Sequence, residues 1–237
     1  VFQGANSGNG ATGAFQSSFI GVNAGQGSSS AFQSNFIGYN SGKLATSAYG
    51  SVFIGNDSGN GAINAAQSVF VGRDSGNGAT SAADSFFLGY RAGYGASSAS
   101  ASAFLGTSAG DGATNATGGV FIGYQAGLSA VDSVGSVFVG QQAGSGATNT
   151  APSIAIGATA TPGAFNNSIA IGTAATSTRD NQFLLPASIT SFKVAGMQAF
   201  DNDADAATGG LVAGELYQTT GAGAAPLNVA GILMIKQ

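Results

Sequence analysis

Apolar and polar positions along the chain repeat with a period of 17 residues. In the copy spanning residues 51–67, the run Val52-Phe53-Ile54 precedes Gly55, and small or polar residues fill the rest. β-Branched and aromatic residues favour a short strand, and glycine favours turns that need a positive φ. Each copy is too short for a pair of helices, so we expect one coil made of two short strands and two turns.

Phenylalanine occupies the centre of the apolar run in most copies, and glycine follows two positions later. The phenylalanines are Phe2, Phe19, Phe36, Phe53, Phe70, Phe87, Phe104, Phe121 and Phe138, and the glycines include Gly21, Gly38, Gly55 and Gly72. A repeat this short cannot bury its own apolar face, so each copy must stack on the next. The pattern predicts an all-β, parallel β-solenoid of about ten 17-residue coils over residues 1–178.

Both faces of each predicted strand are apolar. Side chains alternate across a strand, so Val52 and Ile54 point one way and Phe53 the other. We expect the column that follows phenylalanine to lie inside the coil; its isoleucines include Ile20, Ile37, Ile54 and Ile122. The phenylalanines would then form a large exposed ladder, which three chains could bury around a common axis. In the alternative arrangement, phenylalanine fills the coil and the isoleucine column is half exposed.

Residues 179–237 lose the 17-residue period and carry half of the charged residues. Short apolar runs at 183–185, 192–194, 214–217 and 232–235 predict a small β-rich capping or tip domain. Candidate receptor-binding residues in this tip are Phe200 and Tyr217, as platforms for sugar stacking, and Asp201, Asp203 and Asp205. On a strand the three aspartates would share one face, and in a loop they could bind a cation, although a solvated loop without metal is the expected state.

The composition excludes several classes of function. A net charge of −4 argues against nucleic-acid binding. The absence of histidine and cysteine removes the commonest general base, thiolate ligands and disulfides. No apolar stretch is long enough for a transmembrane helix, so we expect no membrane insertion. The sequence predicts no enzyme, no cofactor and no metal site. Because the chain starts in mid-repeat, we expect it to be the C-terminal part of a longer protein.

Two copies near the end of the repeats carry a family resemblance. Residues 153–157 (Ser-Ile-Ala-Ile-Gly) and 167–172 (Asn-Ser-Ile-Ala-Ile-Gly) resemble the head repeat of trimeric autotransporter adhesins. The resemblance implies a left-handed parallel β-roll with three chains around one axis. The tail is similar to the C-terminal ends of phage tail-fibre and related virion proteins, through residues 181–185, 189–196, 205–217 and 231–236.

These features predict a structural fibre protein of a virion. A rigid homotrimeric rod would present a receptor-binding tip to a glycan or protein on the host cell surface. The alternatives are a bacterial trimeric surface adhesin and the subunit of an extracellular filament, so the expected location is a virion or an extracellular surface. Threonine recurs in alternate coils, which leaves ice binding as another class; the residues are Thr12, Thr46, Thr80, Thr114 and Thr148.

Overall fold

The computed structural model describes residues 1–189, 198–200, 202–212, 216–220 and 233–235. The chain divides into two compact units, Val1–Ser188 and Ile189–Gln237. From the sequence, this boundary was predicted after residue 178. Strand β12 (Phe183–Leu184) still pairs in parallel with β11 (Ile169–Ile171), so the repeat unit extends ten residues further than that boundary.

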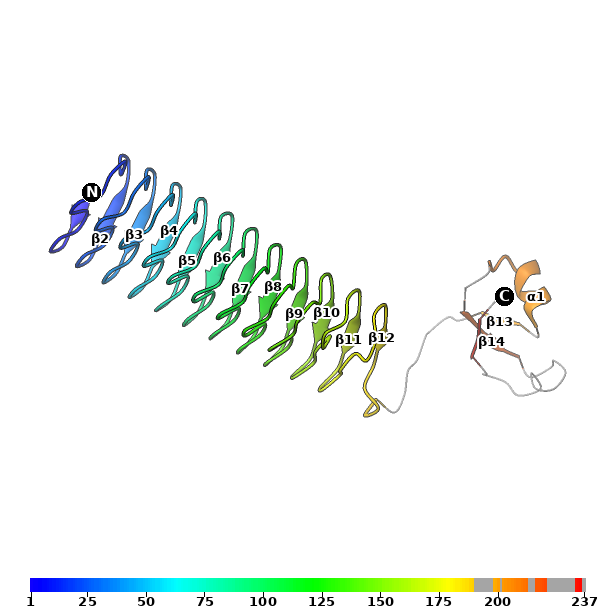
Figure 1. Ribbon diagram of the computed structural model, residues 1–237. Coiled ribbons are helices and arrows are strands. Elements are labelled where there is room, and N and C mark those ends of the chain that lie inside the picture. Colours follow the sequence, from blue (N-terminus) through cyan, green and yellow to red (C-terminus); the bar gives the residue numbers. More distant parts are fainter. Residues whose placement is uncertain (190–197, 201, 213–215, 221–232, 236–237) are drawn as a thin grey trace. The chain divides into compact units, whose positions relative to one another are not determined.

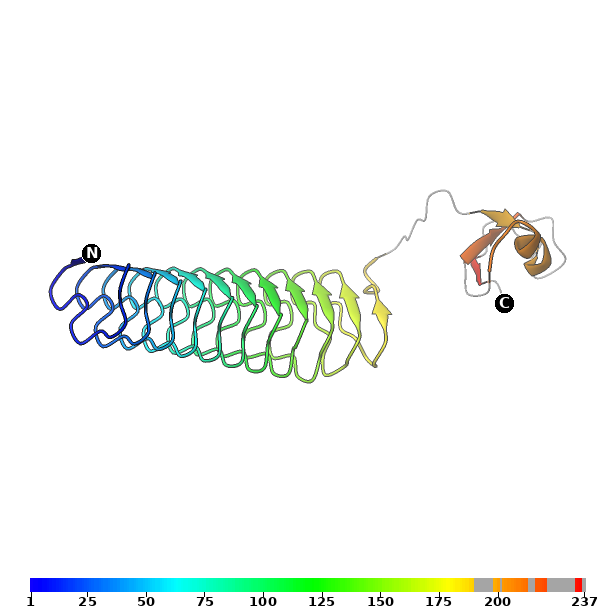
Figure 2. The same ribbon diagram turned by 90° about the horizontal axis from the view of Figure 1, so that it is seen from above.

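The first unit is an all-β parallel β-solenoid (Figure 1). Its strands form one 12-stranded sheet in sequence order: β1 (Phe2–Gln3), β2 (Ser18–Ile20), β3 (Asn35–Ile37), β4 (Val52–Ile54), β5 (Val69–Val71), β6 (Phe86–Leu88), β7 (Ala103–Leu105), β8 (Val120–Ile122), β9 (Val137–Val139), β10 (Ile154–Ile156), β11 and β12. Each residue pairs with its equivalent in the next coil, as Phe53 does with Phe70. Figure 2 shows these coils from above as a single row of stacked turns.

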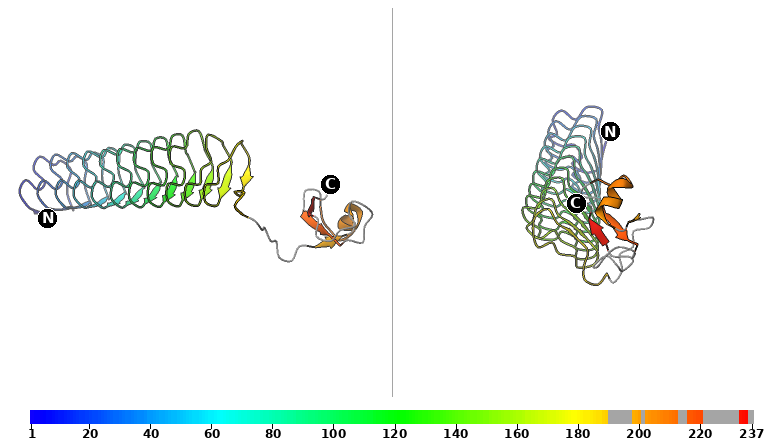
Figure 3. Two further views of the ribbon diagram at one scale, coloured as in Figure 1. Left: turned by 90° about the horizontal axis from the view of Figure 1, so that it is seen from below. Right: turned by 90° about the vertical axis from the view of Figure 1, so that its right-hand side faces the viewer.

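A second, thinner ladder joins the coils through isolated parallel bridges. It connects Thr12 to Ser29 and continues coil by coil to Thr148. The backbone amides around the coil also bond to the neighbouring coil; for example, the Gly55 amide donates to the Ile37 carbonyl at 2.8 Å. The strands lie across the rod (Figure 3). The hydrogen bonds between coils therefore run along it.

The phenylalanine column fills the interior of the coils. The side chains from Phe19 to Phe138 are fully buried, and successive rings stack with centroids 4.7–4.8 Å apart. The expectation that phenylalanine lies outside, at an axis shared by three chains, with isoleucine inside, is therefore wrong. Ile54 is 37% exposed, and Ile20, Ile37 and Ile122 are exposed to a similar degree. The alternative arrangement, with phenylalanine inside, is the one adopted.

Glycine explains why a coil this narrow accepts a phenylalanine ring. A second glycine stands six residues after each phenylalanine, and a Cβ atom on Gly59 would overlap the ring of Phe53. The buried alanines at Ala62 and Ala65 line the rest of the cavity that the ring fills. The phenylalanine ring thus occupies the space that a side chain at the facing glycine position would need.

The glycine two residues after phenylalanine serves a different purpose. Gly55 has a φ of 136°, and a Cβ atom there would overlap the carbonyl of Gly72 in the next coil. Gly21 and Gly38 approach the following coil in the same way. Only glycine combines this backbone conformation with so close an approach, so this column sets the spacing between coils.

The second unit contains β13 (Ala199–Phe200), α1 (Asp203–Thr208), β14 (Leu216–Thr219) and β15 (Leu233–Ile235). Strand β14 pairs in parallel with β13 and antiparallel with β15. The predicted runs at 214–217 and 232–235 overlap β14 and β15, whereas 192–194 lies outside the described residues.

Two of the three aspartates of the tip lie in a helix, and not on a strand or in the expected loop. Asp203 and Asp205 belong to α1. The side chain of Asn202 caps this helix by accepting a hydrogen bond from the Ala204 amide at 2.8 Å. Asp201 lies outside the described residues. Within the described parts of the chain, no helix is long and apolar enough to cross a membrane.

Candidate interaction surface of the solenoid

The outward face of the 12-stranded sheet is apolar along most of its length. Alternation across each three-residue strand turns the residues before and after the buried phenylalanine outward. We call these two columns, from β4 to β11, the apolar strip. Its members are Val52, Ile54, Val69, Val71, Phe86, Leu88, Ala103, Leu105, Val120, Ile122, Val137, Val139, Ile154, Ile156, Ile169 and Ile171.

The apolar strip contains no charged or polar side chain across eight strands. At the usual strand spacing of about 4.8 Å it is about 35 Å long. Its larger members are substantially exposed, including Leu88 at 40% and Ile156 at 39%. Nearer the N-terminus the column before phenylalanine becomes polar, with Ser18 and Asn35. A continuous uncharged face of this kind is typical of a surface that is covered by another protein.

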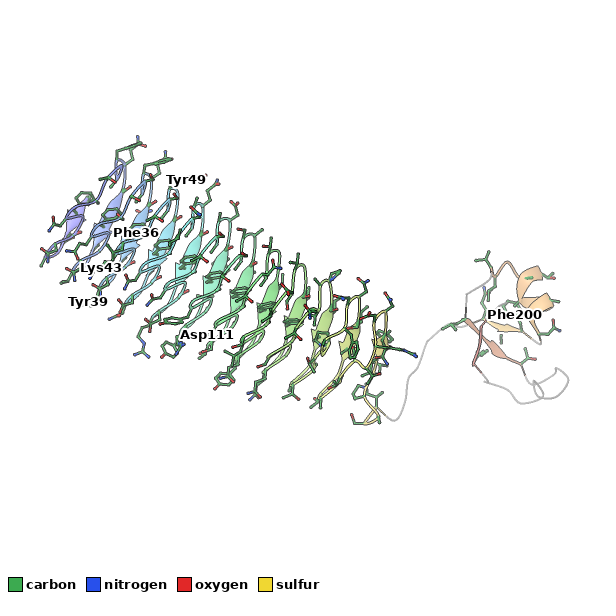
Figure 4. The ribbon with its side chains drawn as sticks, viewed as in Figure 1. Phe36, Tyr39, Lys43, Tyr49, Asp111 and Phe200 are labelled. Atoms are coloured by element: carbon green, nitrogen blue, oxygen red, sulfur yellow. The ribbon has the colours of Figure 1, made fainter. Side chains whose placement is uncertain are left out.

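Two flanks border the apolar strip at the two ends of each outward strand. The leading flank holds the residues three positions before phenylalanine, namely Gln16, Gln33, Gly50, Gln67, Asp84, Ala101, Gly118 and Gly135. The trailing flank holds those three positions after it, namely Val22, Tyr39, Asn56, Arg73, Tyr90, Thr107, Tyr124 and Gln141. Figure 4 shows Tyr39 and Tyr49, the neighbour of Gly50, at opposite ends of their coils with Phe36 between them.

Side-chain ladders stiffen the corners of the coils. Asn23 donates to Asn40 at 3.0 Å, and Asn40 donates to Asp57 at 2.9 Å. All three residues have a positive φ, which Asn and Asp tolerate better than most. A buried serine ladder adds to this, because the Ser51 hydroxyl donates to the Ala65 carbonyl at 2.6 Å and accepts from the Ser68 amide. These repeated bonds hold each corner in register with the next.

One charged cluster joins two neighbouring coils. The Arg91 guanidinium pairs with the Asp111 carboxylate through an Nε–Oδ2 distance of 3.0 Å, and it lies 4.4 Å over the Tyr94 ring. Burial raises the pKa of Asp111, and the attraction of Arg91 opposes this shift. The cluster balances its charges internally, which makes it a link between coils.

The predicted receptor-binding residues of the tip are only partly brought together. Phe200 is half-buried in β13 and Tyr217 lies in the paired strand β14. Asp203 and Asp205 lie in α1, which packs against β13. Among the residues that the structure describes, no group of three His, Cys, Asp or Glu side chains could hold a metal ion.

The threonine column is not a uniform array of hydroxyl groups. Thr46 and Thr80 alternate in the second ladder with Ile63, which is 45% exposed, and Val131 interrupts it again further along. An ordered hydroxyl lattice, as ice binding requires, is therefore absent from this column of described residues. The apolar strip is the exposed surface that the sequence predicted only as its alternative arrangement, and its two flanks had no prediction.

Comparison with known proteins finds likeness in solved structures and none in sequence. No protein-family model matches the chain, and no curated protein matches it. The solenoid is similar to the collagen-binding domain of the Yersinia adhesin YadA, with 22% sequence identity and a TM-score of 0.43. The match covers 81% of this chain and 92% of the other. At this level of similarity it carries no argument about function.

Proposed function

We propose that this chain forms the shaft and tip of a homotrimeric fibre that works outside the cell in attachment to a surface. The observation that carries the proposal is the apolar strip, which a solitary rod would expose to water along eight consecutive strands. Burial of apolar area is favourable by about 25 cal/mol per Å². Three rods that turn their strips toward one axis would bury all of it.

The architecture of the single rod supports a mechanical role. Phenylalanine rings stack without interruption from Phe2 to Phe138, and serine and amide ladders follow the same axis. The repeat unit offers few long charged side chains for proteases such as trypsin, since Lys43, Arg73, Arg91 and Arg179 are its only basic residues. A stiff, resistant spacer is what a fibre shaft requires.

Two resemblances in the sequence suggest which fibre this is. The similarity of residues 181–185, 189–196, 205–217 and 231–236 to the ends of phage tail fibres favours a virion fibre whose tip binds a host-surface glycan or protein. Within the tip, Phe200 and Tyr217 remain the predicted contacts. The second candidate is a bacterial trimeric surface adhesin, favoured by the adhesin-like copies at residues 153–157 and 167–172.

The first experiment is the native mass of the chain by light scattering, compared with its mass after boiling in detergent. A native mass of three chains that falls to one on boiling is the expected result, and a monomer would overturn the proposal. An antiserum against the chain then separates the two fibre types. Immunogold labelling of purified phage particles supports the virion fibre, and labelling confined to the surface of bacteria supports the adhesin.

A further inference from the structure

We propose that the two flanks of the apolar strip meet between neighbouring chains of the fibre, and that Arg73 of one copy pairs with Asp84 of the next. This inference rests on the proposed trimer and assigns its lateral contacts. The partner is another copy of this chain, because only an identical solenoid presents the opposite flank at the same coil spacing.

The first observation is a pair of opposite charges without strong partners in their own chain. The Arg73 side chain is 61% exposed, and its nearest carboxylate, Asp74, is 3.8 Å away. An exposed ion pair of this kind contributes little. Asp84 is exposed, and within the described residues its carboxylate makes no hydrogen bond or ion pair. Arg73 already lies 4.3 Å over the Tyr90 ring, which fixes its direction on the trailing flank.

Arg73 and Asp84 cannot meet within one chain. Asp84 lies three residues before Phe87, and Tyr90 lies three residues after it, at the other end of β6. The three residues of β6 between these two corners alone span about 10 Å. Arg73 occupies the same flank as Tyr90, one coil earlier. When copies are related by rotation about a shared axis, however, the trailing flank of each abuts the leading flank of the next.

The second observation is that the flanks are complementary in size. Each aromatic residue on the trailing flank is followed eleven positions later by a glycine or alanine on the leading flank of the same coil. The pairs are Tyr39 with Gly50, Tyr90 with Ala101 and Tyr124 with Gly135. Arg73 and Asp84 have the same separation. If neighbouring copies bring together residues that are eleven positions apart, a tyrosine ring lies against glycine or alanine at three levels of the rod. At a fourth level the same pairing brings Arg73 and Asp84 together.

The contact also fixes the axial register of the chains. A slip by one coil would move Arg73 from Asp84 to Gln67 or Ala101 of the neighbouring copy. The apolar strip alone changes little from coil to coil and would tolerate such a slip. The flanks supply the specificity, and the strip supplies the buried area.

A cross-linking experiment tests the contact directly, because the chain contains no cysteine. The variant Arg73→Cys/Asp84→Cys is treated in its native state with a short bismaleimide and analysed on a denaturing gel. A covalent trimer is the expected main product, since each chain uses both flanks. The matched control is Arg73→Cys/Gln33→Cys, whose second cysteine lies on the same flank three coils away and should give at most traces of covalent trimer.

A charge reversal tests the energetics. Arg73→Asp and Asp84→Arg each place like charges together and should lower the melting temperature of the trimer, and the double variant should recover most of the loss. A native trimer that shows neither covalent trimers nor recovery overturns this inference and leaves the trimer standing. A monomeric native mass of the unaltered chain overturns both the inference and the proposed function.

Discussion

The ring of Phe53 lies against the backbone of Gly59, at a point where a Cβ atom would overlap the ring. The same pair recurs in every coil that carries phenylalanine, up to Phe138 and Gly144. In the last coils phenylalanine gives way to Ala155 and Ala170, and the turn that carries the facing glycine is shortened, so that Thr161 and Thr176, six residues after these alanines, pair in a bridge like those of the second ladder. The ring and the glycine turn that faces it are thus lost together.

Replacing this glycine should strain the coil. We expect Gly59→Ala to destabilise the solenoid by about 2–4 kcal/mol, because the new methyl group overpacks the core and the residue has a positive φ. Thermal unfolding followed by circular dichroism measures the change. Gly61→Ala is the matched control, since Gly61 has nearly the same φ but nothing within 4 Å of its Cβ position. Equal losses in the two variants would contradict the overlap.

The apolar strip should control association without controlling the fold of the coil. We expect Ile122→Asp to reduce the native mass to that of a monomer, because three buried carboxylates at one level of the axis would lack partners. The β signal in circular dichroism should persist, since Ile122 points out of its coil. The control is Asn64→Asp, which adds a charge at an exposed position beside the second ladder and outside the apolar strip. This variant should remain trimeric. A trimeric Ile122→Asp variant would show that the strip is not the interface.

The asparagine ladder should contribute measurable stability. Asn40 both accepts from Asn23 and donates to Asp57. We expect Asn40→Gly to cost about 1–3 kcal/mol through the loss of two hydrogen bonds, at about 0.5–1.5 kcal/mol each. Glycine keeps the positive φ of this position available, so the comparison isolates the side chain. An unchanged melting temperature would show that water replaces the ladder without loss.

Asp111 should make stability depend on pH. Because burial raises its pKa, the folded chain holds this proton more tightly than the unfolded chain does. The contribution of Asp111 to stability is then largest in acid and falls as pH rises from its ordinary value of about 3.9 through the raised value.

Unfolding curves of the unaltered chain and of Asp111→Asn across this range give the test. The unaltered chain should lose stability relative to the variant as pH rises. The opposite slope would mean that the attraction of Arg91 outweighs burial.

The sequence predicted the period, the position of each three-residue strand and the register, because each depends on spacing alone. The predicted direction of Phe53 and Ile54 was wrong, since alternation produces two apolar columns and either could face inward. Gly59 indicates which column faces inward, because a side chain there would overlap the ring of Phe53. This can be recognised only when the path of the coil is known to place residue 59 opposite residue 53. In the tip, Asp203 and Asp205 were expected in a solvated loop, whereas the Asn202 cap and the alanines favour the observed helix.

The direction of the hydrogen bonds has a mechanical consequence. Because they run along the rod, a pull on its ends loads the coils in series and not side by side. A coil that opens replaces a rise of about 4.8 Å by a chain of 17 residues that can extend to about 55–60 Å. Under load, the rod would therefore lengthen coil by coil and dissipate energy at each step, so that a tether made of it yields before it breaks.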